Sequence, residues 1–330
     1  MPADCVSIVA AGHSRFGRLE GTRLEDLIVQ VTREALKDAA IDASEIDALF
    51  LGHFNSGLVP DGFPASLLLQ ADPGLRFKPA TRCENACASG SAAILAGVQA
   101  ILSGSAELVL VVGAEKMTHT TTAEVTQALA GAGYQNDPAE AGLSFPQLFG
   151  RAARQYAERY HCPLGSMAAI ATKNHSNAMA NPLAQMHRVM DFEHCNNVSQ
   201  SNPFVADSLR LTDCSLISDG AAAIILASPK RARAFRRDVQ IRTLTQVNDC
   251  LPIAQRDILA FEGPQRAIHT ALRGANITLA DLSFAEVHDC FTIAELLIYE
   301  AMGLAPKGEG HRVLDSGVVR AGGRLPVNLS

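Results

Sequence analysis

The 330-residue sequence lacks features that define several classes of protein. It has no apolar run of the roughly 20 residues that a membrane-spanning helix needs. It has no block of lysine and arginine and carries a net charge of -6, so neither nucleic acid nor a membrane surface is an expected partner. The N-terminal residues lack a basic stretch followed by an apolar one, so no secretory signal is visible. We therefore expect a cytoplasmic protein that binds small molecules or other proteins.

The cysteine and glycine patterns exclude further kinds of site. The eight cysteines are too few and too scattered for a disulfide scaffold, and no pair has the Cys-x-x-Cys spacing. Cys83 and Cys87 lack the second ligand pair of a structural zinc site, and we expect no metal. Neither Gly-x-Gly-x-x-Gly nor Gly-x-x-x-x-Gly-Lys occurs, so no phosphate-binding loop is indicated. The thiols are expected to be reduced, and the question is which of them is reactive.

What the sequence does have is an apolar pattern that alternates between strands and helices. Its residues are 48% hydrophobic and 19% charged, and its length suggests about two domains. Apolar runs at 6–12, 47–52 and 107–113 predict buried strands, while 24–40 and 89–103 predict helices. An uninterrupted apolar run such as 107–113 is typical of a strand covered by helices on both faces. The first third of the chain is therefore predicted to be α/β.

The middle of the chain differs from its two ends. Residues 119–208 combine proline-containing loops with polar helices predicted at 148–160 and 164–180. Strand patterns return at 219–227 and 239–247. The α/β pattern is thus interrupted by a helical insertion and then resumes.

An offset of 236 residues relates two segments of the chain. Residues 35–46 (ALKDAAIDASEI) and 271–282 (ALRGANITLADL) share Ala, Leu, basic, Ala, Ile, acidic and aliphatic residues in the same order. A coincidence between two ordinary helix–strand units is one interpretation. We favour an internal duplication of an α/β unit.

The sharpest local signal is the segment 84–91 (ENACASGS), which leads into the helix predicted from residue 89. A cysteine at a helix N-terminus lies near unpaired amide hydrogens and the positive end of the helix dipole, which lowers its pKa and favours the nucleophilic thiolate. The small residues after Cys87 leave room for a substrate. The alternative is a buried small residue in a strand-to-helix turn.

Two further segments carry polar or reactive side chains. His288 and Cys290 follow the repeated strand and can supply a hydrogen-bond donor for an oxyanion and a proton carrier, both needed in acyl transfer. The same residues also suit an ordinary strand end. The polar turn 212–220 leads into the returning strand. Its composition favours an ordinary loop of turn-forming residues over a functional segment. In a duplicated fold we expect Cys87 and the His288 loop to converge between the two halves.

In this order and at these distances, the three segments resemble the thiolase superfamily, most closely the thiolases related to sterol carrier protein X. Residues 84–91 are similar to the nucleophile motif, and 213–223 (DCSLISDGAAA) to the segment that opens the second half. Residues 288–291 (HDCF) are similar to the signature that replaces Asn-Glu-Ala-Phe in this subgroup. Residues 173–175 (KNH) and 181–182 (NP) resemble the subgroup's loop domain. The resemblance covers essentially the whole chain.

The resemblance implies a fold and an assembly. The fold is a five-layered αβαβα sandwich made of two duplicated α/β halves with a helical loop-domain insertion. It places an N-terminal half at 1–118, a loop domain at 119–208 and an incomplete C-terminal half at 209–330. Such proteins assemble as homodimers or homotetramers, and members of this subgroup often pair with a small zinc-ribbon/OB-fold protein.

The resemblance also implies a function and the residues that carry it. The chemistry is acyl transfer through a cysteine-bound thioester, either cleaving a 3-oxoacyl-CoA or condensing acyl-CoAs as an acetyl-CoA acetyltransferase. By resemblance Cys87 is the nucleophile, His288 binds the thioester oxygen, Cys290 is the acid/base, and Ser215 contacts the pantetheine arm. Coenzyme A and acyl-CoA are substrates, and no covalently bound cofactor is implied. The other six cysteines are expected to be packing residues, and the acyl chain and the direction of reaction stay open.

One departure from the family pattern lies at the C-terminal end. Family members continue beyond a segment like 324–330 with a Gly-His-Pro motif whose histidine activates the nucleophile, and none of the ten histidines here lies in such a triplet. We expect little or no turnover from these 330 residues alone. A longer native chain, a truncated product and a second chain that supplies the missing part are the open explanations. The alternative functions are a non-catalytic or partner-dependent thiolase-like subunit and a retro-aldol or ketosynthase-like enzyme of the same fold.

Overall fold

The computed structural model describes residues 5–54 and 57–330, which form two compact units. Unit 1 contains the chain up to Val125 together with Ile217–Leu244. Unit 2 contains Thr126–Leu216 together with Thr245–Ser330. Across the described ranges, no helix combines the length and the apolar character that crossing a bilayer requires. Residues 1–4, which belong to the stretch examined for a secretory signal, lie outside the described residues.

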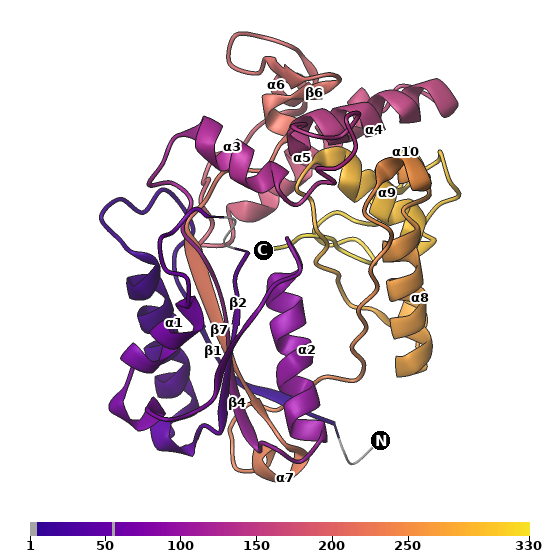
Figure 1. Cartoon of the computed structure of the whole chain (residues 1–330). Coiled ribbons are helices and arrows are strands. Elements are labelled where there is room, and N and C mark those ends of the chain that lie inside the picture. The colour runs from indigo at the N-terminus through magenta and orange to yellow at the C-terminus, as the bar shows by residue number, and fades with distance from the viewer. Residues whose placement is uncertain (1–4, 55–56) are drawn as a thin grey trace. The chain divides into compact units, whose positions relative to one another are not determined.

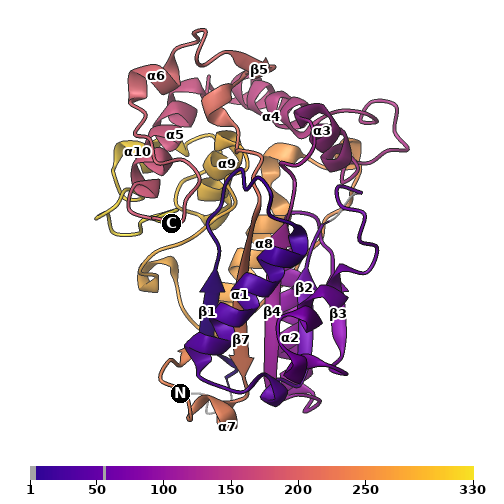
Figure 2. The same ribbon diagram turned by 90° about the vertical axis from the view of Figure 1, so that its left-hand side faces the viewer.

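Unit 1 is built around one mixed six-stranded sheet with the order β3-β2-β4-β7-β1-β8. Its strands are β1 (Ser7–His13), β2 (Ala48–Gly52), β3 (Ala80–Cys83), β4 (Leu108–Glu115), β7 (Gly220–Ala227) and β8 (Val239–Gln240). β2 runs parallel to β3 and β4, whereas β7 runs antiparallel to β4 and β1, and β8 antiparallel to β1. Figure 2 shows β1, β7, β4, β2 and β3 side by side in this order.

Two helices cover this sheet on opposite faces, α1 (Leu24–Ala39) on one and α2 (Ser89–Leu102) on the other (Figure 1). The central strand β4 contributes alternate side chains to the two apolar clusters. Leu108, Leu110 and Val112 join the cluster of α1, and Val109 and Val111 join that of α2. Because successive side chains of a strand point to opposite faces, an uninterrupted apolar strand is what a sheet covered twice requires. The predicted environment of this strand is confirmed.

Most of the elements expected from the sequence are present in unit 1. The structure confirms the strands predicted at 6–12, 47–52, 107–113 and 219–227, and the helices predicted at 24–40 and 89–103, within two residues at each end. The strand predicted at 239–247 is wrong beyond Gln240. β8 pairs antiparallel with the first residues of β1, and Ile241 N donates to Val6 O at 2.9 Å. Residues 241–247 keep the alternating pattern but are not part of a strand, so alternation alone does not make a ladder.

The strand β7 decides how the chain divides. It lies between β4 and β1, so 217–244 folds with unit 1 although it follows unit 2's helices in the sequence. The compact units therefore cut across the three consecutive stretches expected from the resemblance. Those stretches describe a division by family domains, and they stay a prediction.

Unit 2 is mainly helical in its described residues. Its helices are α4 (Phe145–Arg159), α5 (Leu164–Ala178), α6 (Phe192–Asn196), α8 (Glu262–Ala275), α9 (Thr292–Met302) and α10 (His311–Asp315). α3 (Thr122–Ala130) spans the boundary of the units, α7 (Pro229–Ala232) belongs to unit 1, and β5 (Phe204–Ala206) pairs with β6 (Leu209–Arg210) in unit 2. Every residue of α9 is buried, and α9 shares an apolar cluster with α4 and α5. The helices predicted at 148–160 and 164–180 are confirmed as α4 and α5.

The predicted internal repeat is visible in the local backbone. α1 and α8 both end at a left-handed residue, Ala40 and Asn276, each with a φ of 54°. A short 3-10 helix follows each of them at the same spacing, Ala43–Glu45 in one copy and Leu279–Asp281 in the other. The first copy continues into β2, which has partner strands on both sides, whereas in the second copy only Ala285 forms a bridge, to Val327. The repeated sequence thus forms the same turn twice and a ladder only where partner strands exist.

Candidate active site

The nucleophile candidate Cys87 lies between β3 and α2, in a turn that is held by hydrogen bonds. The hydroxyl of Ser89 donates to Ala86 O at 2.7 Å and accepts from Asn85 N at 2.9 Å, and Glu84 Oε1 accepts from Ala86 N at 2.5 Å. Ala86 has a φ of 46°, a left-handed conformation that costs a residue with a Cβ about 1–2 kcal/mol. The turn leaves the side chain of Cys87 exposed.

The small residues that follow Cys87 have a packing role. A Cβ added to Gly52, the last residue of β2, would lie 2.7 Å from Gly90 Cα and 2.7 Å from Ser89 O. The end of β2 and the first turn of α2 therefore touch through their backbones, which only glycine at position 52 permits. This contact holds the start of α2 against the sheet, next to the turn that carries Cys87.

The expected lowering of the pKa of Cys87 is wrong. Desolvation by the protein atoms around the exposed side chain raises the pKa of this thiol, its own backbone amide lowers it, and the carboxylate of Glu115 raises it further. α2 begins at Ser89 with Ala88 as its N-cap, so Cys87 precedes the first turn, within which a helix dipole acts most strongly. At neutral pH the resting group is therefore a neutral thiol, and a base must remove its proton before it attacks.

Unit 2 brings Ser215 next to the HDCF segment, residues 288–291. Ser215 N donates to Cys290 O at 3.0 Å, and the preceding Cys214 forms an antiparallel bridge with Phe291. The ring of Phe291 is buried and stacks on Phe149 with ring centroids 4.6 Å apart. Two of the predicted site residues are thus neighbours in the fold.

His288 is exposed to solvent on its loop. Desolvation by the protein around the ring lowers the pKa of His288, and the neighbouring Asp289 partly opposes this. Since the ordinary pKa of histidine is already below 7, the imidazole is neutral at neutral pH. A neutral ring has one N–H to donate and one nitrogen that accepts.

The four predicted site residues are divided between the units. Cys87 belongs to unit 1, whereas Ser215, His288 and Cys290 belong to unit 2. The convergence of Cys87 with the His288 loop stays a prediction.

The eight cysteines are all free and fall into different environments. Cys195 is buried, and burial raises the pKa of half-buried Cys214 to about 12. Both behave as packing residues, as expected. Cys162 and Cys250 are exposed, which does not fit the expectation that they are packing residues.

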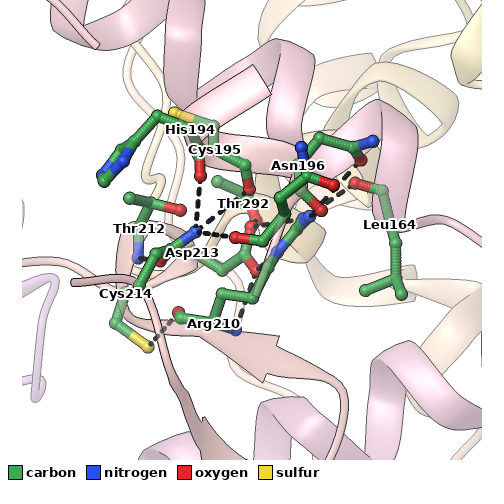
Figure 3. A network of polar contacts seen from close by, with 11 residues as sticks. Leu164, His194, Cys195, Asn196, Arg210, Thr212, Asp213, Cys214 and Thr292 are labelled. Carbon is green, nitrogen blue, oxygen red and sulfur yellow. Dashed lines mark hydrogen bonds and ion pairs between the residues drawn. The ribbon is translucent and has the colours of Figure 1, made fainter. Parts of the chain in front are cut away.

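A buried ion pair holds the turn that leads to Ser215 (Figure 3). Arg210 is fully buried, and its guanidinium donates to Asp213 Oδ2 at 2.8 Å and Oδ1 at 3.2 Å. The same group donates to Asn196 O and Leu164 O, each at 2.8 Å, so its remaining donors are satisfied. Thr292 Oγ1 donates to Asp213 Oδ1 at 2.9 Å. The pair therefore ties the turn before Ser215 to α5, α6 and the first residue of α9.

Sequence reasoning missed three residues that support this region. Arg210 lies in a polar stretch where a buried guanidinium gives no local signal. Glu295 is detectable, because it is one of two charges in the otherwise apolar segment 292–302 (TIAELLIYEAM), and a charge in such a helix needs buried partners. Asn174 was part of a matched motif, but apart from the bond it accepts from Lys173, its side chain bonds to residues more than 100 positions away.

A family model described as the thiolase N-terminal domain matches residues 6–230, and one described as thiolase C-terminal domain-like matches residues 245–330. An acetyl-CoA acetyltransferase of Methanothermobacter thermautotrophicus is 35% identical over 327 residues, which are 98% of this chain and 84% of that protein. Sterol carrier protein 2 of Oryctolagus cuniculus is 28% identical over 352 residues, covering the whole chain and 62% of that protein.

Solved structures are similar in fold. One described as Ltp2-ChsH2(DUF35) aldolase has a TM-score of 0.82 at 21% identity, covering 98% of this chain and 84% of that one. Human mitochondrial 3-ketoacyl-CoA thiolase in complex with CoA has a TM-score of 0.70 at 19% identity, covering 96% and 93%. These likenesses confirm the fold class that the sequence predicts.

Proposed function

This chain belongs to the thiolase family, and on that premise we propose that it is an acyltransferase that moves acyl groups to and from coenzyme A through a thioester on Cys87. The relatives described as acetyl-CoA acetyltransferases, 35% identical over 98% and 94% of the chain, support this activity. They favour it over a non-catalytic subunit and over a retro-aldol enzyme of the same fold. The substrates are acyl-CoA and coenzyme A, with no resident cofactor.

The observation that carries the proposal is the turn that presents Cys87. Its thiol is exposed, while the backbone around it is fixed by Ser89, by Glu84 and by the contact of Gly52 with α2. A fixed nucleophile with open access is what attack on a bound thioester or ketone requires. The raised pKa of Cys87 means that the thiol is activated by proton transfer during the reaction and not before it.

The proposed cleavage proceeds in two balanced steps. The sulfur of Cys87 bonds to the carbonyl carbon at position 3 of a 3-oxoacyl-CoA, and its proton passes to a base. The bond between carbons 2 and 3 breaks, and carbon 2 takes a proton from Cys290 to release acetyl-CoA. In the second step Cys290, now a thiolate, takes the proton of the coenzyme A thiol, whose sulfur bonds to the acyl carbon. The bond between that carbon and the sulfur of Cys87 breaks, the shortened acyl-CoA leaves, and Cys87 regains its proton from the base.

The other proposed roles use the groups that lie around Cys290. His288, as a neutral imidazole, donates its N–H to the thioester oxygen, which gains negative charge in the transition state. Ser215, whose backbone N–H is bound to Cys290 O, contacts the pantetheine arm through its side chain. In the condensation direction the same groups act in reverse order.

Incubation with acetyl-CoA followed by intact-mass spectrometry and peptide mapping tests the proposal. We expect one acetyl group per chain, located on Cys87, and none in the Cys87→Ala variant. Cys250→Ala is the matched control, because Cys250 is also exposed and has no proposed role. The absence of an adduct on Cys87 in the native protein, or equal labelling of Cys250, would contradict the proposal.

The proposed assembly is a homodimer or homotetramer, with a small zinc-ribbon/OB-fold protein as a further partner. The solved neighbour described as Ltp2-ChsH2(DUF35) aldolase supports the possibility of a second protein. Light scattering of the purified protein measures its oligomeric state. Co-purification with a candidate zinc-ribbon/OB-fold protein tests whether that protein binds. A monomer in solution at micromolar concentration would contradict the proposed dimer. A cytoplasmic location stays a prediction.

A further inference from the structure

A buried polar network in unit 2 joins three segments that are distant in the sequence. Asn174 on α5 donates one amide hydrogen to Asp289 Oδ2 and the other to Glu295 Oε2, both at 2.7 Å. Asp289 is the middle residue between His288 and Cys290, and Glu295 lies in the first half of α9. Asn328, near the end of the chain, donates to Glu295 Oε2 at 3.0 Å. The network therefore connects α5, the HDCF segment, α9 and the residues around 328.

Glu295 is the centre of this network and is fully buried. Lys173 Nζ lies 3.0 Å from its Oε1, and the hydroxyl of Tyr299 donates to the same oxygen. Lys173 also donates to Val327 O at 2.7 Å. A buried carboxylate is tolerated only when it is paired and its lone pairs are satisfied, and here both conditions are met. The carboxylate of Glu295 is therefore held in place, and it fixes the position of the Asn174 amide that donates to it.

Among the described residues, no lysine or arginine forms an ion pair with Asp289. Burial and then the nearby Glu295 raise the pKa of Asp289, while the Asn174 hydrogen bond and His288 lower it. Lys173 pairs with Glu295, so the amide of Asn174 is the group that joins the two acidic side chains. An aspartate at position 174 would add a third acidic group, and an aliphatic residue would leave both oxygens without this donor.

We propose that Asn174 is a positioning residue for the reaction: its amide holds the side chain of Asp289 against the anchored Glu295 and so fixes the backbone between His288 and Cys290. The inference rests on the proposed function, because it assumes that this segment acts on the acyl group. The side chain of Asn174 bonds to Lys173, Asp289 and Glu295, so it acts on His288 and Cys290 through the backbone that joins them.

The backbone on either side of Asp289 is held as well. Val287 N donates to Asn328 Oδ1 at 2.7 Å, and Ala285 O accepts from Asn328 N at 2.9 Å. On the other side, Cys290 O accepts from Ser215 N at 3.0 Å. The side-chain bond from Asn174 acts between these two points. Since small displacements of reacting groups reduce rates strongly, loss of this bond is expected to lower turnover.

The bond also carries an electrostatic signature that simple loosening of the fold would not reproduce. The groups that face Asp289 are Asn174 on α5, Glu295 and Tyr299 on α9, and His288 beside it. Asn174 favours the ionised form of Asp289, and ionised Asp289 raises the pKa of His288. Removing the amide should therefore lower the pKa of His288 below its native value.

The test compares Asn174→Leu with Asn177→Leu. Asn177 lies one turn further along the same helix and donates to Asn328 O at 2.7 Å, so its loss removes a buried amide bond without touching Asp289. In a chain extended through the Gly-His-Pro region of the family, we expect Asn174→Leu to lower kcat for thiolysis of acetoacetyl-CoA about tenfold or more with KM within about twofold. NMR titration should show a lower pKa for His288. Asn177→Leu keeps the bond to Asp289, so it should leave the titration of His288 at the native value and lower kcat less than Asn174→Leu does.

Several outcomes would overturn the positioning role. One is a native kcat and a native His288 titration in Asn174→Leu, and another is an equal change in Asn177→Leu. If Asn174→Leu does not fold, Asp289→Ala breaks the same bond from the other side and should show the same loss of kcat, so a native kcat there also overturns it.

A failure of the proposed acyltransferase function would give a different result from a failure of the positioning role of Asn174. It would leave the native protein without an acetyl adduct on Cys87. The titration of His288 in the two variants would still decide whether Asn174 controls Asp289.

Discussion

Asp219 is the buried carboxylate that best tests how unit 1 is held together. It is fully buried and accepts from Lys116 Nζ at 2.6 Å and from Thr118 Oγ1 at 2.5 Å. It also accepts from the backbone N of Met117 and Thr118 at 2.8 Å each and of Leu19 at 3.0 Å. These bonds join the loop after β4 and the segment before α1 to the residue that precedes β7. The sequence alone suggested only a turn-forming aspartate at this position.

Asp219→Ala removes one partner of a buried ion pair and leaves Lys116, whose side chain is 7% exposed, without its carboxylate. Removing one partner of such a pair costs about 3–5 kcal/mol. Each buried N–H left unsatisfied costs about 1–3 kcal/mol, but the loop can turn some of its groups toward water. We therefore expect the free energy of unfolding of unit 1 to fall by about 4 kcal/mol.

Urea denaturation followed by far-UV circular dichroism measures this change, and hydrogen exchange with mass spectrometry locates it. Exchange should increase in peptides that contain Leu19 and 116–118. Glu262→Ala is the control, because the ion pair of Glu262 with Arg266 is on the surface and is worth less than about 1 kcal/mol. A loss below 1 kcal/mol in Asp219→Ala, or one equal to that of the control, would refute the assigned role.

The pH dependence of stability provides a second measure of the same group. Burial raises the pKa of Asp219, but the hydrogen bonds from Lys116, Thr118 and Met117 outweigh it, and the net pKa is lowered. A lowered carboxyl pKa adds stability above the unfolded-state pKa, and this stability is lost as pH falls through the lower folded value. The difference in unfolding free energy between native protein and Asp219→Ala should therefore be constant near neutrality and shrink below about pH 4.

Three further predictions concern the Cys87 turn. Alkylation of Cys87 by iodoacetamide should reach half of its maximal rate above the ordinary pKa of a cysteine thiol, because its pKa is raised; a midpoint below pH 7 would contradict this. Gly52→Ala should lower the unfolding free energy by about 1–3 kcal/mol and slow acetylation of Cys87, because the added Cβ would meet Gly90. Gly113→Ala is the control: its Cβ meets open space, so it should cost less than half as much. Ala86→Gly should raise the unfolding free energy by up to about 1 kcal/mol by relieving the left-handed φ, as thermal melts can show, and a lower melting temperature would count against strain at this turn.

Periodicity predicted the elements of unit 1 because burial there follows simple repeats. β4 is apolar on both faces, and α1 carries a single apolar stripe, so each pattern indicates its environment without knowledge of its neighbours. The same reasoning failed at 239–247, since alternation indicates a strand but a ladder needs a partner edge. It also failed for the pKa of Cys87. Proximity to a helix N-terminus suggests a lowered value, whereas desolvation and the charge of Glu115 depend on atoms brought in by β4.

The sequence by itself determined the α/β character of unit 1 and the repeated turn at the ends of α1 and α8, because these follow from the side-chain period and from local turn residues. The fold class and the segments that carry Cys87, Ser215, His288 and Cys290 came from the resemblance of its short motifs to the thiolase superfamily. The tertiary structure alone decided that β7 joins the first sheet between β4 and β1. It also decided that Asn174 and Glu295 surround Asp289, because buried polar groups must find partners wherever the folded chain places them, at any distance along the sequence.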